Sequence, residues 1–200
     1  MNTKNETLPK HQALYQIAER QAGYFTARQA NTVGLTRPLL SYMVKTGALQ
    51  RIQHGIYRLT RFPEMPFADL FIAWLAVGPR AVISHASALA VYELSDGIPS
   101  ANHLTVPRTT SRRHKGLRLH TNTLRSTEIT QRAGLPLTTV PRTLADLAAG
   151  GLSEEQIRHA VHETIARGLV TRVALAEYAQ QRGGRAARLI GEALATETAE

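Results

Sequence analysis

Residues 36–59, TRPLLSYMVKTGALQRIQHGIYRL, begin with a helical pattern and end with a hairpin pattern. Thr36 is a suitable N-cap, Pro38 is tolerated in the first turn of a helix, and Gly47 is a common helix stop. We therefore predict a helix from Thr36 to about Thr46. Apolar residues at helical spacing mark the side of this helix that faces a core, namely Leu40, Met43 and Val44.

Two short strands follow this helix, at 49–53 and 56–59, and the glycine between them suits a hairpin turn because it accepts a positive φ. Before the helix, apolar spacing predicts two further helices, at 11–21 and 27–33, with a short extended piece between them. Three helices followed by a hairpin is the element order of a winged helix-turn-helix. The third helix then takes the place of the recognition helix, which lies in the DNA major groove.

The solvent side of the predicted recognition helix and the hairpin, or wing, carries basic and polar residues. Arginine and lysine side chains reach phosphates and guanine edges. No Asp or Glu occurs between Arg20 and Arg61, whereas a face selected only for solubility would mix both signs. The candidate DNA contacts are Thr36, Arg37, Ser41, Tyr42, Lys45, Arg51, Gln53, His54 and Arg58. Small winged domains also serve as protein-interaction modules, and this alternative is retained.

The remainder of the chain predicts a second domain. The segment FPEMP at 62–66 holds two prolines that stiffen a short link, so we assign residues 1–65 to the winged helix and residues 66–200 to the second domain. The whole chain is predicted to be mainly α with small β, an α+β fold. In the second domain we expect short strands at 81–83, 102–106, 117–120 and 137–140, and helices at 67–77, 85–94, 141–149, 154–167, from 171 and at 186–195.

A strongly basic connection lies between the second and third of these strands. Three interpretations stay open: a second contact with phosphates, a solvated loop, or a binding site for an acidic partner. Its basic residues are Arg108, Arg112, Arg113, Lys115 and Arg118.

Composition limits the class of protein. The chain has 200 residues, a formal net charge of +9 and no cysteine, which excludes disulfide scaffolds, cysteine-ligated zinc and cysteine nucleophiles. The positive excess lies in residues 1–150 and favours a polyanionic partner, with nucleic acid as the first candidate. The sequence has neither a transmembrane run nor the apolar core of a signal peptide, so we expect a cytoplasmic protein without a membrane partner.

Signatures of catalysis are missing. A metal-dependent nuclease needs clustered carboxylates, and the sequence has no D-x-D pair, phosphate-cradling loop or nucleophile elbow. His159 and His162 share a helix face, but such a pair is more often a solvated surface than a metal site. We interpret Ser84-His85 as a helix cap with a packing residue, and an Arg142–Asp146 pair as structural. We expect no enzyme activity, no catalytic residue, no cofactor and no metal.

Several motifs occur in a specific order along residues 10–150. The first part holds Gly34-Leu-Thr-Arg37, Thr46-Gly47-Ala48-Leu49 and His54-Gly55-Ile56-Tyr57-Arg58-Leu59. The second holds Ile83-Ser84-His85-Ala86-Ser87-Ala88-Leu89-Ala90, His103-Leu104-Thr105-Val106-Pro107 and Leu137-Thr138-Thr139-Val140-Pro141-Arg142-Thr143-Leu144-Ala145-Asp146-Leu147. With this order the chain resembles the AbiEi-type antitoxins, winged-helix regulators of type IV toxin–antitoxin systems.

The resemblance implies a specific function. AbiEi-type proteins are repressors of their own operon, binding inverted repeats of double-stranded DNA in the promoter, and antitoxins opposed to a nucleotidyltransferase-like toxin. The N-terminal domain would bind DNA and the following domain would carry the antitoxic role. Two other classes stay as alternatives: a protein-interaction module that neutralises a partner without touching DNA, and a nuclease-related domain.

Overall fold

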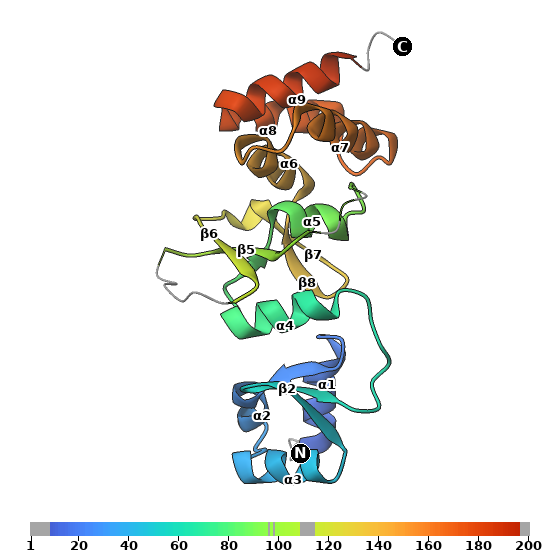
Figure 1. Cartoon of the computed structure of the whole chain (residues 1–200), viewed down its shortest axis with the longest axis vertical. Helices are drawn as coiled ribbons and strands as arrows, with labels where there is room; N and C mark the ends of the chain where they lie inside the picture. The colour runs from blue at the N-terminus through green and yellow to red at the C-terminus, as the bar shows by residue number, and fades with distance from the viewer. Residues whose placement is uncertain (1–8, 96, 98, 109–114, 197–200) are drawn as a thin grey trace, which may run out of the picture. The chain divides into compact units, whose positions relative to one another are not determined.

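The computed structural model describes residues 9–95, 97, 99–108 and 115–196, and it divides into two compact units, Met1–Pro79 and Arg80–Glu200 (Figure 1). The unit boundary differs from the sequence-based assignment of residues 66–79 to the second domain. These residues hold helix α4 (Ala68–Val77), which is apolar except for Asp69 and packs against β1 and β3 of the first unit. The Pro-rich link therefore connects the wing to a helix of the same unit.

The first unit has the element order of a winged helix-turn-helix. Its elements are α1 (Lys10–Glu19), β1 (Tyr24–Thr26), α2 (Ala27–Thr32), α3 (Arg37–Lys45), β2 (Leu49–Gln53) and β3 (Ile56–Leu59). These bounds confirm the predicted helices to within two residues at each end and both predicted wing strands. The short extended piece is a third strand, β1, and the antiparallel sheet has the order β1-β3-β2.

Local signals in the sequence explain where these elements begin. Thr26 caps α2 through a capping box, in which its hydroxyl accepts from the Gln29 backbone N–H and the Gln29 side chain accepts from the Thr26 backbone N–H. Gly23 has a φ of 86°, in the left-handed region that glycine tolerates, and it carries the chain from α1 into β1.

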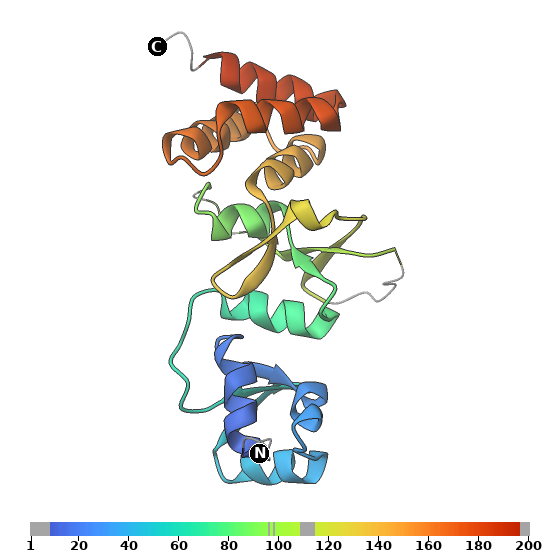
Figure 2. The same ribbon diagram turned by 180° about the vertical axis from the view of Figure 1, so that it is seen from behind.

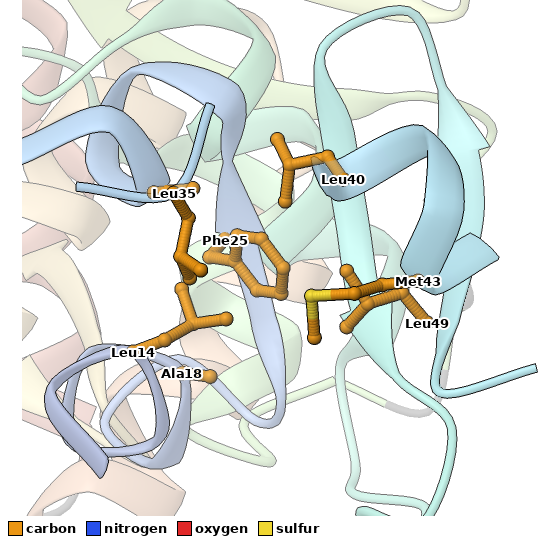
Figure 3. Packing of buried hydrophobic residues seen from close by; sticks show 8 residues of the cluster. Leu14, Ala18, Phe25, Leu35, Leu40, Met43 and Leu49 are labelled. Atoms are coloured by element: carbon orange, nitrogen blue, oxygen red, sulfur yellow. The ribbon is translucent and has the colours of Figure 1, made fainter. Parts of the chain in front are cut away.

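The core of the first unit lies between α1, α3 and the sheet. Figure 3 shows Phe25 of β1 at its centre, with side chains from α1 on one side and from α3 and β2 on the other. Its buried members are Leu14, Ala18, Phe25, Ala30, Leu35, Leu40, Met43 and Leu49. Leu40 and Met43 confirm the predicted inner side of the recognition helix. Because this side of α3 is held in the core, its other side faces solvent.

The second unit is built around a five-stranded mixed sheet. Its strands are β4 (Val82–Ile83), β5 (Asn102–Val106), β6 (Leu117–Thr121), β7 (Ile129–Arg132) and β8 (Leu135–Thr138), in the order β6-β5-β4-β8-β7. Strands β5 and β6 are parallel, as are β4 and β8, whereas the pairs β4–β5 and β7–β8 are antiparallel. The polar strand β7 was not predicted, and β8 begins and ends two residues earlier than the predicted strand 137–140.

The helices of the second unit gather mostly beyond one end of the sheet. They are α5 (His85–Val91), α6 (Val140–Ala149), α7 (Glu154–Ala166), α8 (Arg172–Arg182) and α9 (Gly184–Thr196), with a 3-10 turn, η1, at Ser126–Glu128. Helix α9 packs against α6, α7 and α8, the orange and red helices of Figure 2. Helix α5 is three residues shorter than predicted, since the backbone turns at Glu93, where φ is 57°. Both units thus combine helices with a small sheet, which confirms the α+β fold class.

Two local predictions had different outcomes. Ser153 and Gln156 form the predicted capping box of α7. Ser84 was predicted to cap α5, but its hydroxyl makes no cap hydrogen bond and instead accepts from the Thr105 hydroxyl at 2.9 Å. Ser84 is fully buried, so its hydroxyl serves the sheet rather than the helix end. None of the helices in the described ranges combines the length and hydrophobicity needed to cross a bilayer.

Candidate nucleic-acid interface

Helix α3 presents one basic and polar side to solvent. Arg37, Ser41 and Lys45 are exposed at successive intervals of four residues, which places them in one stripe along the helix. Tyr42 lies beside this stripe with 63% of its surface exposed, so its ring is not part of the core. Thr36 at the N-cap is also exposed and makes no cap hydrogen bond through its side chain. All five predicted residues of this helix are therefore on its solvent side.

The wing adds polar side chains from β2 and the turn. After buried Leu49, the remaining residues of β2 are exposed, including Arg51 and Gln53. The pairing with β3 shifts between Arg51 and Gln53, so the strand bulges at Ile52. At the tip, Arg51 Nη2 lies 3.5 Å from His54 Nδ1, which brings two of the predicted contacts together.

Arg58 was predicted as a wing contact, and the structure contradicts this. Only 8% of its surface is exposed, and its Nη2 donates to the carbonyl oxygens of Phe62 at 2.7 Å and Pro63 at 3.1 Å. Its guanidinium also lies over the ring of Tyr24, 5.7 Å from the centroid. Arg58 therefore anchors the chain that follows the wing and does not face a ligand.

The charge of this surface is uncompensated. Among the described residues, no ion pair involves Arg37, Lys45 or Arg51. Sequence reasoning left out Arg28, which is exposed in the first turn of α2, the helix that precedes α3 in the helix-turn-helix. The signal that could have found it is the acid-free stretch from Arg20 to Arg61, which includes this arginine.

The second predicted basic site is only partly described. Arg108, Lys115 and Arg118 are exposed, whereas Arg112 and Arg113 lie outside the described residues. Arg118 is on β6 and pairs in register with His103 of β5. Exposed cations therefore lie near both ends of the connection between the two strands.

The histidine pair considered for a metal is at the surface. His159 and His162 of α7 are both exposed, and His162 Nδ1 lies 3.7 Å from Glu163 Oε1 of the same helix. Within the described part of the chain, His, Asp and Glu form no group of three that could hold a metal ion.

The surface on α3 and the wing lies within one stretch that matches a known family. Residues 12–60 match the family described as "Transcriptional regulator, AbiEi antitoxin". The AbiEi match begins within α1 and ends just after β3, so it includes α2, α3 and the two strands of the hairpin. It confirms the resemblance drawn from the sequence and supports a general role in transcriptional regulation of the antitoxin type.

Solved structures extend the comparison of the fold beyond the AbiEi match. The chain is similar to the crystal structure of the RV2827C protein from Mycobacterium tuberculosis, with a TM-score of 0.57 and 13% sequence identity. The similarity covers 93% of this chain and 76% of that chain, so both units take part in it. No curated protein matches the chain.

Proposed function

We propose that the chain is a transcriptional repressor that binds double-stranded DNA through α3 and the wing. The observation that carries the proposal is the exposed stripe of Arg37, Ser41 and Lys45, set on a helix whose opposite side is fixed in the core. In a helix-turn-helix this stripe faces the base edges and phosphates of the major groove. The wing residues Arg51, Gln53 and His54 then reach the flanking backbone or the minor groove.

The proposal predicts sequence-specific binding to inverted repeats upstream of the chain's own gene. A gel-shift or fluorescence-anisotropy titration with that DNA, and with a shuffled duplex of the same composition, measures specificity. Repeating it over a range of salt concentrations counts phosphate contacts, because each contact changes the slope of log K against log salt by about 0.9. We expect the Arg37→Ala and Lys45→Ala variants to weaken binding and to flatten this slope.

A matched control lies in the acidic C-terminal quarter. Arg158 is exposed on α7, so Arg158→Ala removes the same charge away from α3 and the wing and is expected to leave the titration unchanged. If the Arg37→Ala and Lys45→Ala variants bind the operator as tightly as the parent protein at every salt concentration, α3 is not the DNA-binding helix. Alanine variants are also made of the uncharged residues Thr36, Ser41 and Tyr42. For these, the measurement is the ratio of affinities for the operator and the shuffled duplex, rather than the salt slope.

We further propose, from the AbiEi match alone, that the chain is the antitoxin of a nucleotidyltransferase-like toxin. We assign the antitoxic role to the second unit, as the resemblance implies. Co-expression with the product of the neighbouring gene tests it, with growth as the readout. If the second unit rescues growth without the first, antitoxicity is independent of DNA binding; if neither the full chain nor the second unit rescues growth, the antitoxin proposal fails.

A further inference from the structure

Three histidines from three different elements meet in the second unit. His85 begins α5, His103 lies in β5 and His120 lies in β6. The rings of His85 and His120 stack, with centroids 3.5 Å apart and an interplanar angle of 11°. His120 Nε2 lies 3.1 Å from His103 Nδ1, close enough for a hydrogen bond between the two rings. We call these three residues the histidine cluster.

The register of the sheet builds this cluster. Parallel pairing sets His103 beside Arg118 and Thr105 beside His120. Because residues two apart in a strand share a face, all four side chains lie on the same face of the sheet. His85 joins them through Ser84, whose hydroxyl accepts from Thr105 and lies 3.0 Å from His85 Nδ1. The face therefore combines imidazoles, hydroxyls and a guanidinium.

The electrostatic surroundings keep these rings neutral. Burial, repulsion from the other two histidines and the charge of Arg142 lower the pKa of His85 to about 3. Burial, His120 and Arg118 lower the pKa of His103 to about 4. Burial and Arg118 also lower the pKa of His120, and Asp146 opposes them. An anion among these groups would reverse the effect, because it favours the protonated imidazoles.

Arg142 supplies an independent observation. It is 1% exposed; its Nε and Nη1 are bound to Asp146 and Glu128, but its Nη2 is buried without a hydrogen-bond partner. A buried N–H without an acceptor is rare in folded proteins and costs free energy. Positive charge also exceeds negative charge around Arg142 and the cluster. Among the described residues, two carboxylates, Glu128 and Asp146, face four arginines: Arg118, Arg125, Arg142 and Arg182.

We propose that the histidine cluster, with Arg118 and Arg142, is a binding site for a tetrahedral dianion of the phosphomonoester class. The site offers imidazole and guanidinium donors, and a dianion matches the surplus of positive charge. A metal ion is not the proposed ligand, because no group of three His, Asp or Glu residues within the described residues could hold one. The proposal is independent of DNA binding by the first unit.

Sulfate is the probe that isolates the protein's contribution, because its charge stays at −2 between pH 6 and pH 8. We expect sulfate to shift the imidazole ¹⁵N resonances of His85, His103 and His120 in the full-length chain. Binding should be tighter at pH 6 than at pH 8 by about tenfold or more, since each proton taken up on binding contributes up to tenfold per pH unit. Equal affinity at both pH values overturns the proposal, as does Zn²⁺ binding that strengthens with pH while sulfate does not bind.

Matched variants separate the site from general charge effects. His120→Gln and Arg118→Gln should lower sulfate affinity at least tenfold, whereas His159→Gln and Arg158→Gln, which are exposed on α7, should not. Thermal unfolding checks that each variant is folded. Retained affinity in both cluster variants overturns the proposal.

The class of ligand follows from competition with sulfate. Adenosine 5′-monophosphate should compete and adenosine should not, because only the former carries the dianion. A 5′-phosphorylated oligonucleotide, compared with its 5′-hydroxyl form, shows whether the phosphomonoester of a nucleic-acid end is also accepted. Competition by adenosine equal to that of the monophosphate would contradict recognition of the phosphate.

Discussion

Arg142 Nε lies 2.6 Å from Asp146 Oδ2, and both side chains are almost excluded from solvent. The pair predicted from their spacing is the centre of a larger network. Arg142 Nη1 also binds Glu128 at 3.1 Å, and Asp146 accepts from Arg182 of α8 at 3.2 Å. The network therefore joins α6 to η1 and α8, three elements that are distant in the sequence.

Replacing Arg142 by methionine should destabilise the second unit strongly. The change leaves Glu128 and Asp146 buried with fewer positive partners, and breaking a buried pair in this way costs about 3–5 kcal/mol. Urea unfolding followed by circular dichroism measures the loss. The control is Arg188→Met, because Arg188 pairs with Glu154 and Glu192 on the surface. A loss for Arg142→Met no greater than that for the control would contradict the role of the network.

Glu128 should make the stability of the chain sensitive to acid. Burial alone raises the pKa of Glu128, but hydrogen bonds from Tyr178 and the Arg125 backbone, with the charge of Arg142, outweigh it and lower the pKa to about 2. A carboxylate whose pKa falls on folding stabilises the protein above its ordinary pKa, near 4.5. This contribution is lost as the pH falls from about 4.5 towards 2.

The measurement is the free energy of urea unfolding from pH 7 to pH 2 for the parent chain and Glu128→Gln. The difference between the two should be largest at neutral pH and should shrink below about pH 4.5. Contributions from the histidines cancel in this difference. A difference that is constant with pH would show that the charge of Glu128 does not stabilise the fold.

Gly23 and Gly47 offer a paired test of backbone strain and steric fit. Both have a positive φ, of 86° and 77°. A Cβ at Gly23 would lie 2.7 Å from Phe62 Cβ, whereas a Cβ at Gly47 would meet nothing within 4 Å. Gly47→Ala should cost about 1 kcal/mol from its left-handed backbone, and Gly23→Ala should cost a further 1–3 kcal/mol, approximately, from the clash. Equal losses in urea unfolding would refute the close approach of Phe62.

Arg51 and Arg58, one on each strand of the wing, should differ in what they affect. Arg58→Ala should lower the free energy of unfolding by about 1–3 kcal/mol, because two carbonyl groups lose their donor. Arg51→Ala should leave stability unchanged and weaken DNA binding with a flatter salt dependence. Thermal unfolding and anisotropy on both variants check this. A lower DNA affinity for Arg58→Ala at full stability would restore the original prediction for that residue.

Local sequence patterns were sufficient for most elements of the first unit. The spacing of Leu40 and Met43 predicted the buried side of α3, and a glycine turn predicted the wing, because these signals depend on neighbouring residues. Arg58 was misassigned because of the path that the chain takes just after the wing. The backbone of Phe62 and Pro63 folds back over this side chain, and no periodicity within the strand indicates it.

The histidine cluster of the second unit could not be predicted from local sequence patterns. His85, His103 and His120 meet only because β5 and β6 pair in parallel beside α5, a choice of topology that no local pattern specifies. Strand β7 was missed because only its first residue, Ile129, is apolar, so it has no alternating pattern. The Arg142–Asp146 pair was found because its i, i+4 spacing is a local signal within one helix.

The parallel pairing of β5 and β6 also constrains the basic connection between them. Two parallel strands that follow each other in the sequence require the chain to return from the end of the first strand to the level at which the second begins. Arg108 lies two residues after the end of β5 and Lys115 lies two residues before the start of β6, so the two cations belong to opposite ends of parallel strands that are each about 16 Å long for five residues. The cations of this connection are therefore divided between the two ends of the strand pair, although they are close together in the sequence.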